Sequence, residues 1–454
     1  MREVKISDIA RKLGCEIGYD AVIKNVTTDS REVNDGDLFV AIKGENFDGN
    51  KFAKSALEKG ACAVCVSELC EGVDPAKALL VDDTKRALIK IGGVYREGFS
   101  IPFVGITGSV GKTTTKEFIA TVLGEKYKVH KTEGNRNNEI GVPMTLMALE
   151  DSAEIGVIEM GMCGFGEIHD LTTEVKPAVG VITSIGVSHI ELLGSRENIL
   201  KAKLELLDGM KEGSPLFLCG DNDLLCTVND ERYKIYRYGI TNSECDILAR
   251  DIVQVGSSMK FVIDSPWGEY TATIPLVGMH NVLDALAAFG VGCVMGVEPK
   301  IAAKALEKYV PVGFRQKITR HNGMVVVEDC YNCSPDSLRA AALALAASPC
   351  DGRKIMVVSD MLELGEHSGE MHRECGAFIA RQEIDLLMGC GEATENTVQG
   401  AYSAGMERCK HYSDKETLYN ELVKTARSGD VIWFKASRGM KLEEVSGKLL
   451  GKGE

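Results

Sequence analysis

A glycine-rich segment carries the residue types that bind a nucleoside triphosphate. It follows the apolar run Phe103–Thr107 and opens a helical pattern at Lys112. Glycines in such a turn let backbone N–H groups point into one concavity, where they bind phosphate oxygens at a helix N-terminus. We expect Lys112 to reach the β- and γ-phosphates of ATP and the Thr113 hydroxyl to bind Mg²⁺. The alternative is a purely structural turn. The residues of this predicted phosphate loop are Thr107, Gly108, Ser109, Val110, Gly111, Lys112, Thr113 and Thr114.

Two more apolar strands end in polar side chains. Glu159 closes the run Ile155–Glu159, and His189 follows the run Ala178–Ser184. The carboxyl ends of parallel strands meet at one edge of a sheet, where a carboxylate could serve as a metal ligand. Glu159 could instead be a solvated strand end, and His189 could be structural. By residue pattern alone, Lys203 is expected to be a solvated charge on a helix that starts near Ser195.

Three strand ends in the last third of the chain repeat this arrangement. Polar residues follow the apolar runs Met324–Asp329, Lys354–Ser359 and Val431–Lys435. Open α/β sheets bind ligands at such strand ends. Three clusters of this kind therefore predict a second part of the site in this region.

The elements that must position these residues alternate between apolar strands and amphipathic helices from about residue 102 onward. That alternation is typical of a parallel sheet covered by helices on both faces. A β-rich stretch is expected over 245–275, with a turn at Pro266–Gly268. Residues 1–100 mix short strands and helices, beginning with an amphipathic helix within Met1–Leu13.

We therefore expect an α/β protein of three domains. Residues 1–100 would form a small α/β domain, 101–313 a central ATP-binding domain with a parallel sheet, and 314–454 a second α/β domain.

Composition excludes several classes of protein. The 454 residues are 44% hydrophobic and carry a formal charge of −14, which disfavours a general nucleic-acid binder. No signal peptide and no apolar run long enough for a membrane span is found, so we expect a cytoplasmic protein. Fifteen cysteines scattered through apolar segments predict reduced, mostly buried thiols.

In this order, the motifs resemble those of the Mur ligases of peptidoglycan synthesis over nearly the whole chain. The family's phosphate loop, TG[ST]xGK[ST], fits Thr107–Thr113. Asp329–Asn332 followed by Pro335 is similar to the DxYNANP string of the dipeptide-adding members. Asp360–Gly365 with His372 resembles their DMLELG…H string, and Lys435–Arg438 their KGSR string.

The resemblance implies that residues 1–100 bind the UDP-linked substrate and that 314–454 form a Rossmann-like domain that binds nucleotide and dipeptide. It also implies roles for individual residues. Lys112, His189 and Lys203 would be catalytic, and Lys203 would be carbamylated, which replaces the solvated interpretation given above. Mg²⁺ would be held by Thr113, Glu159, His189 and Lys203. ATP would also contact Asn281, Arg315, Asp329 and Tyr331. The other substrates would contact Asp29, Ser30, Arg31, Lys43, Gly44, Asn332 and Asp336.

The implied activity is an ATP- and Mg²⁺-dependent ligation of D-alanyl-D-alanine to UDP-N-acetylmuramoyl-tripeptide, by a monomer with no nucleic-acid or membrane partner. Two alternatives remain at this point. One is a related ligase that adds another amino acid, or glutamate to a folate. The other is a regulatory ATPase whose last domain binds a partner protein.

Overall fold

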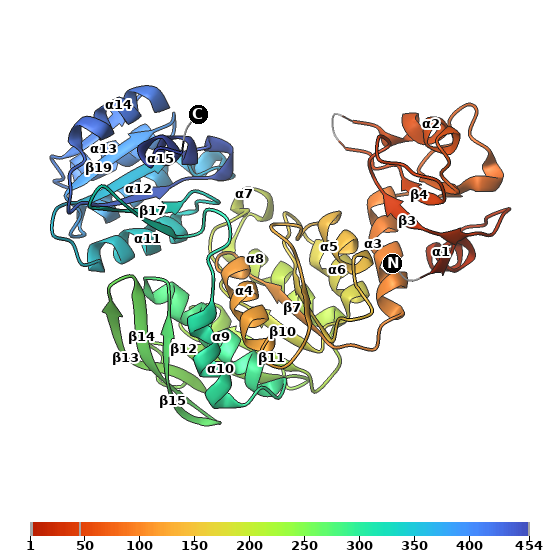
Figure 1. Cartoon of the computed structure of the whole chain (residues 1–454), viewed down its shortest axis with the longest axis horizontal. Helices are drawn as coiled ribbons and strands as arrows, with labels where there is room; N and C mark the ends of the chain where they lie inside the picture. The colour runs from red at the N-terminus through yellow and green to blue at the C-terminus, as the bar shows by residue number, and fades with distance from the viewer. Residues whose placement is uncertain (1–2, 45–46, 453–454) are drawn as a thin grey trace. The chain divides into compact units, whose positions relative to one another are not determined.

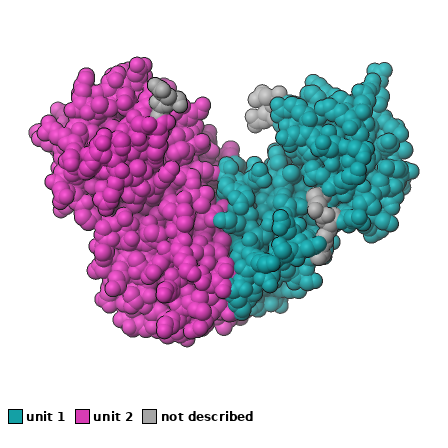
Figure 2. All heavy atoms as spheres, viewed as in Figure 1, with its two compact units in different colours: residues 1–107, 126–181, 202–215 teal, residues 108–125, 182–201, 216–454 magenta. Residues whose placement is uncertain are grey.

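The computed structural model describes residues 3–44 and 47–452, which divide into two compact units (Figure 2). Unit 1 contains residues 1–107, 126–181 and 202–215, and unit 2 contains residues 108–125, 182–201 and 216–454. Figure 1 labels the elements of both units. Among the described residues, no helix combines the length and the apolar character that a membrane crossing requires.

Unit 1 begins with a four-stranded parallel sheet in the order β3-β4-β5-β6 and an antiparallel pair, β1-β2. Four further strands follow the order β10-β7-β9-β8, in which β9 is parallel to both neighbours. The strands are β1 (Val4–Lys5), β2 (Val22–Ile23), β3 (Asn25–Thr27), β4 (Asp37–Val40), β5 (Ala63–Val66), β6 (Ala78–Leu80), β7 (Phe103–Thr107), β8 (Val129–Lys131), β9 (Ile155–Glu159) and β10 (Val179–Ile182). The helices are α1 (Ile6–Leu13), α2 (Ala53–Glu58), α3 (Thr84–Glu97), α5 (Gly141–Met147) and α6 (Glu167–Val175).

Helix α3 joins the first sheet of unit 1 to the later helices. Asp83 caps its N-terminus by accepting hydrogen bonds from the backbone N–H groups of Lys85 and Arg86. Gly92 and Gly93 let α5 and α6 approach closely. A Cβ on Gly92 would lie 2.7 Å from Pro143, and one on Gly93 would lie 1.8 Å from the Glu174 carboxylate. The two glycines are therefore required by packing.

Unit 2 contains the strands in the order β15-β14-β13-β12-β11 and a six-stranded sheet in the order β16-β17-β21-β18-β19-β20. The strands are β11 (Pro215–Cys219), β12 (Lys234–Gly239), β13 (Ile247–Val255), β14 (Ser258–Ser265), β15 (Gly268–Ile274), β16 (Lys317–His321), β17 (Met324–Asp329), β18 (Lys354–Ser359), β19 (Leu386–Cys390), β20 (Cys409–Tyr412) and β21 (Val431–Lys435). Its helices are α4 (Lys112–Leu123), α7 (Ile190–Leu193), α9 (Met279–Val294), α10 (Pro299–Ala305), α11 (Pro335–Ala347), α12 (Ser368–Ala380), α13 (Thr394–Ser403), α14 (Lys415–Thr425) and α15 (Glu443–Leu449). Helix α8 (Arg196–Leu204) contributes residues to both units.

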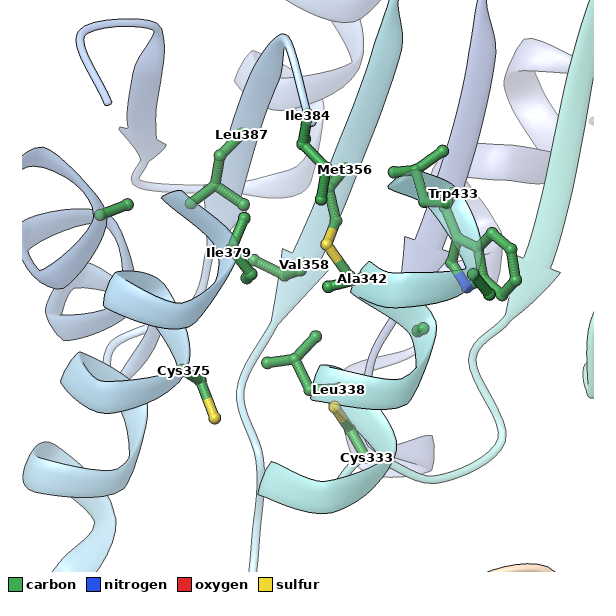
Figure 3. Packing of buried hydrophobic residues seen from close by; sticks show 14 of the residues in the cluster. Cys333, Leu338, Ala342, Met356, Val358, Cys375, Ile379, Ile384, Leu387 and Trp433 are labelled. Carbon is green, nitrogen blue, oxygen red and sulfur yellow. The ribbon is translucent and has the colours of Figure 1, made fainter. Parts of the chain in front are cut away.

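The six-stranded sheet packs its helices against strands that are buried on both faces. In β18, five of six positions are buried, and β21 is buried throughout. Trp433 of β21 and Met356 and Val358 of β18 face Leu338 and Ala342 of α11 (Figure 3). This apolar core holds the ends of β17, β18 and β21 at one edge of the sheet.

The structure departs from the sequence-based expectations at several elements. Seven strands in the described part of the chain lie outside the expected apolar runs: β1, β2, β3, β8, β12, β16 and β20. Helix α11 starts at Pro335, where Ser334 and Ser337 form a reciprocal capping box around a proline in the first turn. The expected helix at the N-terminus is confined to Ile6–Leu13, and Met1 and Arg2 lie outside the described residues.

Candidate functional site

The phosphate loop connects β7 to α4 and depends on two glycines with positive φ. Gly108 has φ 149° and Gly111 has φ 90°, and Gly111 caps the N-terminus of α4. A Cβ on Gly108 would lie 1.9 Å from Thr183 Oγ1, and one on Gly111 would lie 2.6 Å from Asp284 Oδ1. No larger residue fits either position without displacing its neighbours.

The segment after β10 holds the loop in this shape. The backbone N–H of Ser109 donates to the Ser184 carbonyl at 2.8 Å, and that of Val110 donates to Ser184 Oγ at 2.9 Å. Ser109 Oγ in turn accepts from Gly186 N–H at 2.9 Å. Lys112 Nζ donates to the Gly108 carbonyl at 2.7 Å, so its ammonium group lies over the loop. An anion placed here would meet a cation and a helix N-terminus.

Residues from two later segments contact the first turn of α4. Arg315 Nη2 donates to Thr113 Oγ1 at 2.9 Å, and its guanidinium lies 4.0 Å from the centre of the Tyr331 ring. Thr115 Oγ1 donates to Asp284 Oδ1 at 2.8 Å. The structure thus brings together Thr113, Arg315 and Tyr331, which the sequence resemblance had implied.

Asp284 was not among the predicted site residues. It lies on α9 with 6% of its surface exposed, and burial raises the pKa of its carboxyl to about 7, against a hydrogen bond from Thr115 and the charge of Arg315. A single acidic residue in the apolar string of α9 gives no local sequence signal. The one feature that could have pointed to Asp284 is its position three residues after Asn281, which places both on the same side of a helix.

Lys435 organises the end of β17 in the second sheet of unit 2. Its ammonium group forms an ion pair with Asp329 at 3.0 Å and donates to the Asn332 carbonyl at 2.7 Å. Asn281 lies at the start of α9, where its amide donates to the Val277 carbonyl and to Gln316 Oε1. Asp329 and Asn281 are therefore held in place by polar contacts, whereas Asn332 is exposed and is held through its backbone carbonyl.

The segment Val187–His189 makes one contact with Asp336, in the first turn of α11, and another with Glu363. Asp336 Oδ2 accepts from the backbone N–H of Val187 at 3.3 Å. His189 Nδ1 lies 3.3 Å from Glu363 Oε2. His189 and Glu363 have φ of 64° and 65°, in a region that residues other than glycine rarely adopt and that is often found at functional sites.

Unit 1 contains Glu159 and Lys203, and both side chains are buried, each with 1% of its surface exposed. The interpretations of Glu159 as a solvated strand end and of Lys203 as a solvated helix charge are therefore wrong. Glu159 pairs in register with Ile106 of β7, one residue before the phosphate loop begins, and its Oε1 accepts from the Asn137 amide at 2.7 Å.

The candidate residues for substrate binding in the first hundred positions lie on loops of unit 1. Arg31 forms an ion pair with Asp29 at 2.6 Å and lowers the pKa of that carboxyl to about 2. The Ser30 carbonyl accepts from Lys59 Nζ at 2.7 Å. Lys43 and Asp48 form an isolated antiparallel β-bridge through their backbones, and Gly44 N–H donates to the Phe47 carbonyl at 2.8 Å.

No group of three or more His, Cys, Asp and Glu side chains among the described residues could hold a metal ion by itself. Mg²⁺ at a phosphate site usually takes one or two protein oxygens and completes its shell with phosphate and water. The Thr113 hydroxyl in unit 2 is one oxygen donor of that kind, and the Glu159 carboxylate in unit 1 is another.

A cavity of about 230 Å³ lies in another part of unit 2. It is lined by the turn between β13 and β14, by the first residues of β17 and β21, and by the segment after α11. None of the candidate site residues lines it.

Comparisons with known proteins agree with the motifs. Three family models match this chain: "Mur ligase family, catalytic domain" over residues 22–86, "Mur ligase middle domain" over 106–292 and "Mur ligase, glutamate ligase domain" over 315–438. A UDP-N-acetylmuramoyl-tripeptide–D-alanyl-D-alanine ligase from Bacillus subtilis is 40% identical over 93% of this chain and 92% of its own length. The ligase of the same name from Escherichia coli is 33% identical over 98% of each chain.

Solved structures show the same fold. MurF from Acinetobacter baumannii superposes with a TM-score of 0.91 at 27% identity, over 100% of both chains. MurF ligase from Thermotoga maritima in complex with ADP gives 0.85 at 29% identity, over 94% of this chain and 97% of that one. The expected α/β fold class is confirmed. By its motifs, its matched domains and its relatives, this chain belongs to the Mur ligase family.

Proposed function

We propose that this chain joins D-alanyl-D-alanine to UDP-N-acetylmuramoyl-tripeptide at the expense of ATP and so makes the pentapeptide precursor of the cell wall. The observation that carries the proposal is the phosphate loop with Arg315 bonded to its Thr113 hydroxyl. The 40% identity to a ligase of that name over 93% of the chain supports the choice of substrates.

The reaction needs an activated carboxyl group, because a carboxylate is a poor electrophile. The terminal carboxylate of the tripeptide attacks the γ-phosphorus of ATP, which gives an acyl phosphate and ADP. The amine of the dipeptide then attacks the acyl carbon. Phosphate leaves from the tetrahedral intermediate, and an amide bond remains. Catalysis of this kind depends mainly on positioning and on charge stabilisation.

We assign the ATP phosphates to the phosphate loop, with the Lys112 ammonium and the α4 N-terminus offsetting phosphoryl charge. Asn281, Arg315, Asp329 and Tyr331 hold the rest of the nucleotide in this proposal. Asn332 and Asp336 serve the incoming dipeptide.

Four residues are proposed as ligands of Mg²⁺: Thr113 and His189 of unit 2, and Glu159 and Lys203 of unit 1. Bound Mg²⁺ would neutralise charge on the phosphoryl oxygens. Burial of Lys203 supports a role away from solvent, and carbamylation by CO₂ would turn its amine into an oxygen ligand. Intact-protein mass spectrometry of K203A against the wild type would detect the added mass of CO₂.

The domain roles follow from the same proposal. Residues 1–100, through Asp29–Arg31 and Lys43–Gly44, hold the UDP end of the substrate. Residues 101–313 bind ATP, and 314–454 bind nucleotide and dipeptide. We further propose a monomer that works in the cytoplasm, where its nucleotide substrates are made, in peptidoglycan synthesis and cell division.

The test is phosphate release from ATP in the presence of UDP-N-acetylmuramoyl-tripeptide, with and without D-alanyl-D-alanine. Release that requires the dipeptide, with a pentapeptide product in the mass spectrum, is the expected result. Release that requires another amino acid would identify a different ligase of the family. Slow release that is indifferent to both co-substrates would favour a regulatory ATPase.

A further inference from the structure

The carboxyl group of Asp284 lies directly behind the phosphate loop. A Cβ added to Gly111 would lie 2.6 Å from Oδ1, 3.4 Å from Cγ and 3.5 Å from Oδ2. The Thr115 hydroxyl donates to Oδ1 at 2.8 Å, and Thr115 itself is fully buried. Asp284 thus contacts both the residue that caps α4 and the first turn of that helix.

This position gives the charge of Asp284 two opposite effects. A carboxylate near a helix N-terminus interacts favourably with the helix dipole. The same N-terminus is where the loop would bind nucleotide phosphates, and two negative charges that compete for it repel each other. An ionised Asp284 therefore weakens phosphate binding. A protonated Asp284 carries no charge and does not compete with the phosphate for the helix dipole or for Lys112.

The groups that face Asp284 do not compensate for this repulsion. Arg315 is the nearby cation, but its guanidinium is engaged by Thr113 and Tyr331. The other titratable neighbours are Tyr309 after the 3-10 turn Leu306–Lys308, Cys219 of β11 and Tyr238 of β12. Burial raises the pKa of each of them, so all three stay neutral near pH 7.

We propose that Asp284 is a positioning residue of the phosphate loop whose carboxyl group takes up a proton from solvent when a nucleotide binds. The inference rests on the proposed nucleotide site and names a coupling within it. Burial already raises the pKa of Asp284 to about 7, so the proton would be exchanged in the physiological range. Bound phosphate raises that pKa further, because it disfavours the ionised form.

The test is the Kd of Mg²⁺–ADP, measured by titration calorimetry between about pH 6 and about pH 9 for the wild type, D284N and E125Q. Asparagine has the shape of the protonated side chain and cannot titrate. Each unit by which phosphate raises the pKa makes binding about tenfold weaker at high pH than at low pH. We expect at least about a tenfold loss in the wild type and less than about twofold in D284N.

E125Q removes one charge near the far end of the same helix, where Glu125 pairs with Lys308, and should follow the wild type. Calorimetry in buffers of different ionisation enthalpy should show proton uptake by the wild type near pH 7 and none by D284N. T115V, which removes the hydrogen bond that lowers the pKa of Asp284, should move the midpoint of the pH dependence upward.

A D284N protein that loses affinity with pH as the wild type does would overturn the proposal. If D284N does not fold, an unchanged midpoint in T115V would do the same. Tight binding that does not change with pH in the wild type would contradict the coupling between nucleotide binding and protonation of Asp284. That result would still support the proposed nucleotide site. An absence of Mg²⁺–ADP binding at every pH contradicts the proposed function as well.

Discussion

At the scale of single residues, Arg315 connects the phosphate loop to the second sheet of unit 2. One guanidinium donates to Thr113 Oγ1 and stacks on Tyr331. A lysine keeps the charge but cannot do both, because its ammonium is a point charge without a planar face. We expect R315K to weaken Mg²⁺–ADP binding by about tenfold, as loss of one charged hydrogen bond would.

The control for this prediction is R320K, at an exposed arginine on the nearby strand β16. It should bind nucleotide like the wild type. Equal affinities of R315K and the wild type in calorimetry would show that charge alone suffices at position 315.

Asp284 should also make stability depend on pH. Its pKa rises from the ordinary 3.8 to about 7 on folding, so the folded state holds the proton more tightly than the unfolded state. Stability contributed by the protonated form is present below pH 3.8 and is lost as the pH rises to about 7. D284N has no carboxyl group at this position, so its free energy of unfolding does not fall in this way. The fall in the wild type is at most about 4 kcal/mol.

Thermal unfolding at a series of pH values measures this effect. The Tm of D284N relative to the wild type should rise between about pH 4 and about pH 7 and stay level above that. A constant difference in Tm would mean that Asp284 does not titrate in the folded protein.

The burial of Asp284 and of Lys203 could not be predicted from the sequence, because it depends on tertiary neighbours that no local pattern reveals.

At the scale of elements, the phosphate loop depends on the backbone of Gly111. Gly166 offers a matched comparison, since both glycines cap a helix with nearly the same φ, 90° and 84°. A Cβ at Gly166 meets no atom within 4 Å, whereas one at Gly111 meets Asp284. Both alanine variants share a backbone strain of about 1 kcal/mol.

We therefore expect G166A to keep nucleotide affinity with a slightly lower Tm. G111A should lose at least about a hundredfold in affinity, because the loop must move to admit the new methyl group. Calorimetry with Mg²⁺–ADP, together with Tm, separates the two effects. Nucleotide binding by G111A at the wild-type affinity would show that the loop tolerates this displacement.

Elements were predictable from the sequence where burial is complete. The bounds of β7, β9, β17, β18 and β21 agree with the apolar runs because both faces of a parallel strand are covered, which leaves an uninterrupted signal. β16 was missed because it is half exposed and pairs antiparallel at the edge of its sheet. Short strands such as β8, with three half-buried residues, give too few positions for a pattern.

At the scale of the whole molecule, the proposed nucleotide residues come from distant parts of the sequence. Lys112 and Thr113 precede residue 314, whereas Arg315, Asp329 and Tyr331 follow it. The order of the motifs predicts that these residues share one site, because strand-end clusters recur along the chain. The contacts between the segments, such as Arg315 to Thr113, were not predictable, since they depend on side-chain positions 202 residues apart.

Three substrates must meet within bonding distance for the proposed reaction, and their proposed ligands lie in all three sequence blocks. We therefore expect substrates to draw these blocks together before chemistry. In small-angle X-ray scattering, the radius of gyration should fall when UDP-N-acetylmuramoyl-tripeptide and a non-hydrolysable ATP analogue are added together. R315A should compact less than the wild type at saturating ligand, because Arg315 is the link from the later block to the phosphate loop. A radius that does not change with both ligands bound would mean that the reacting groups meet without such a movement.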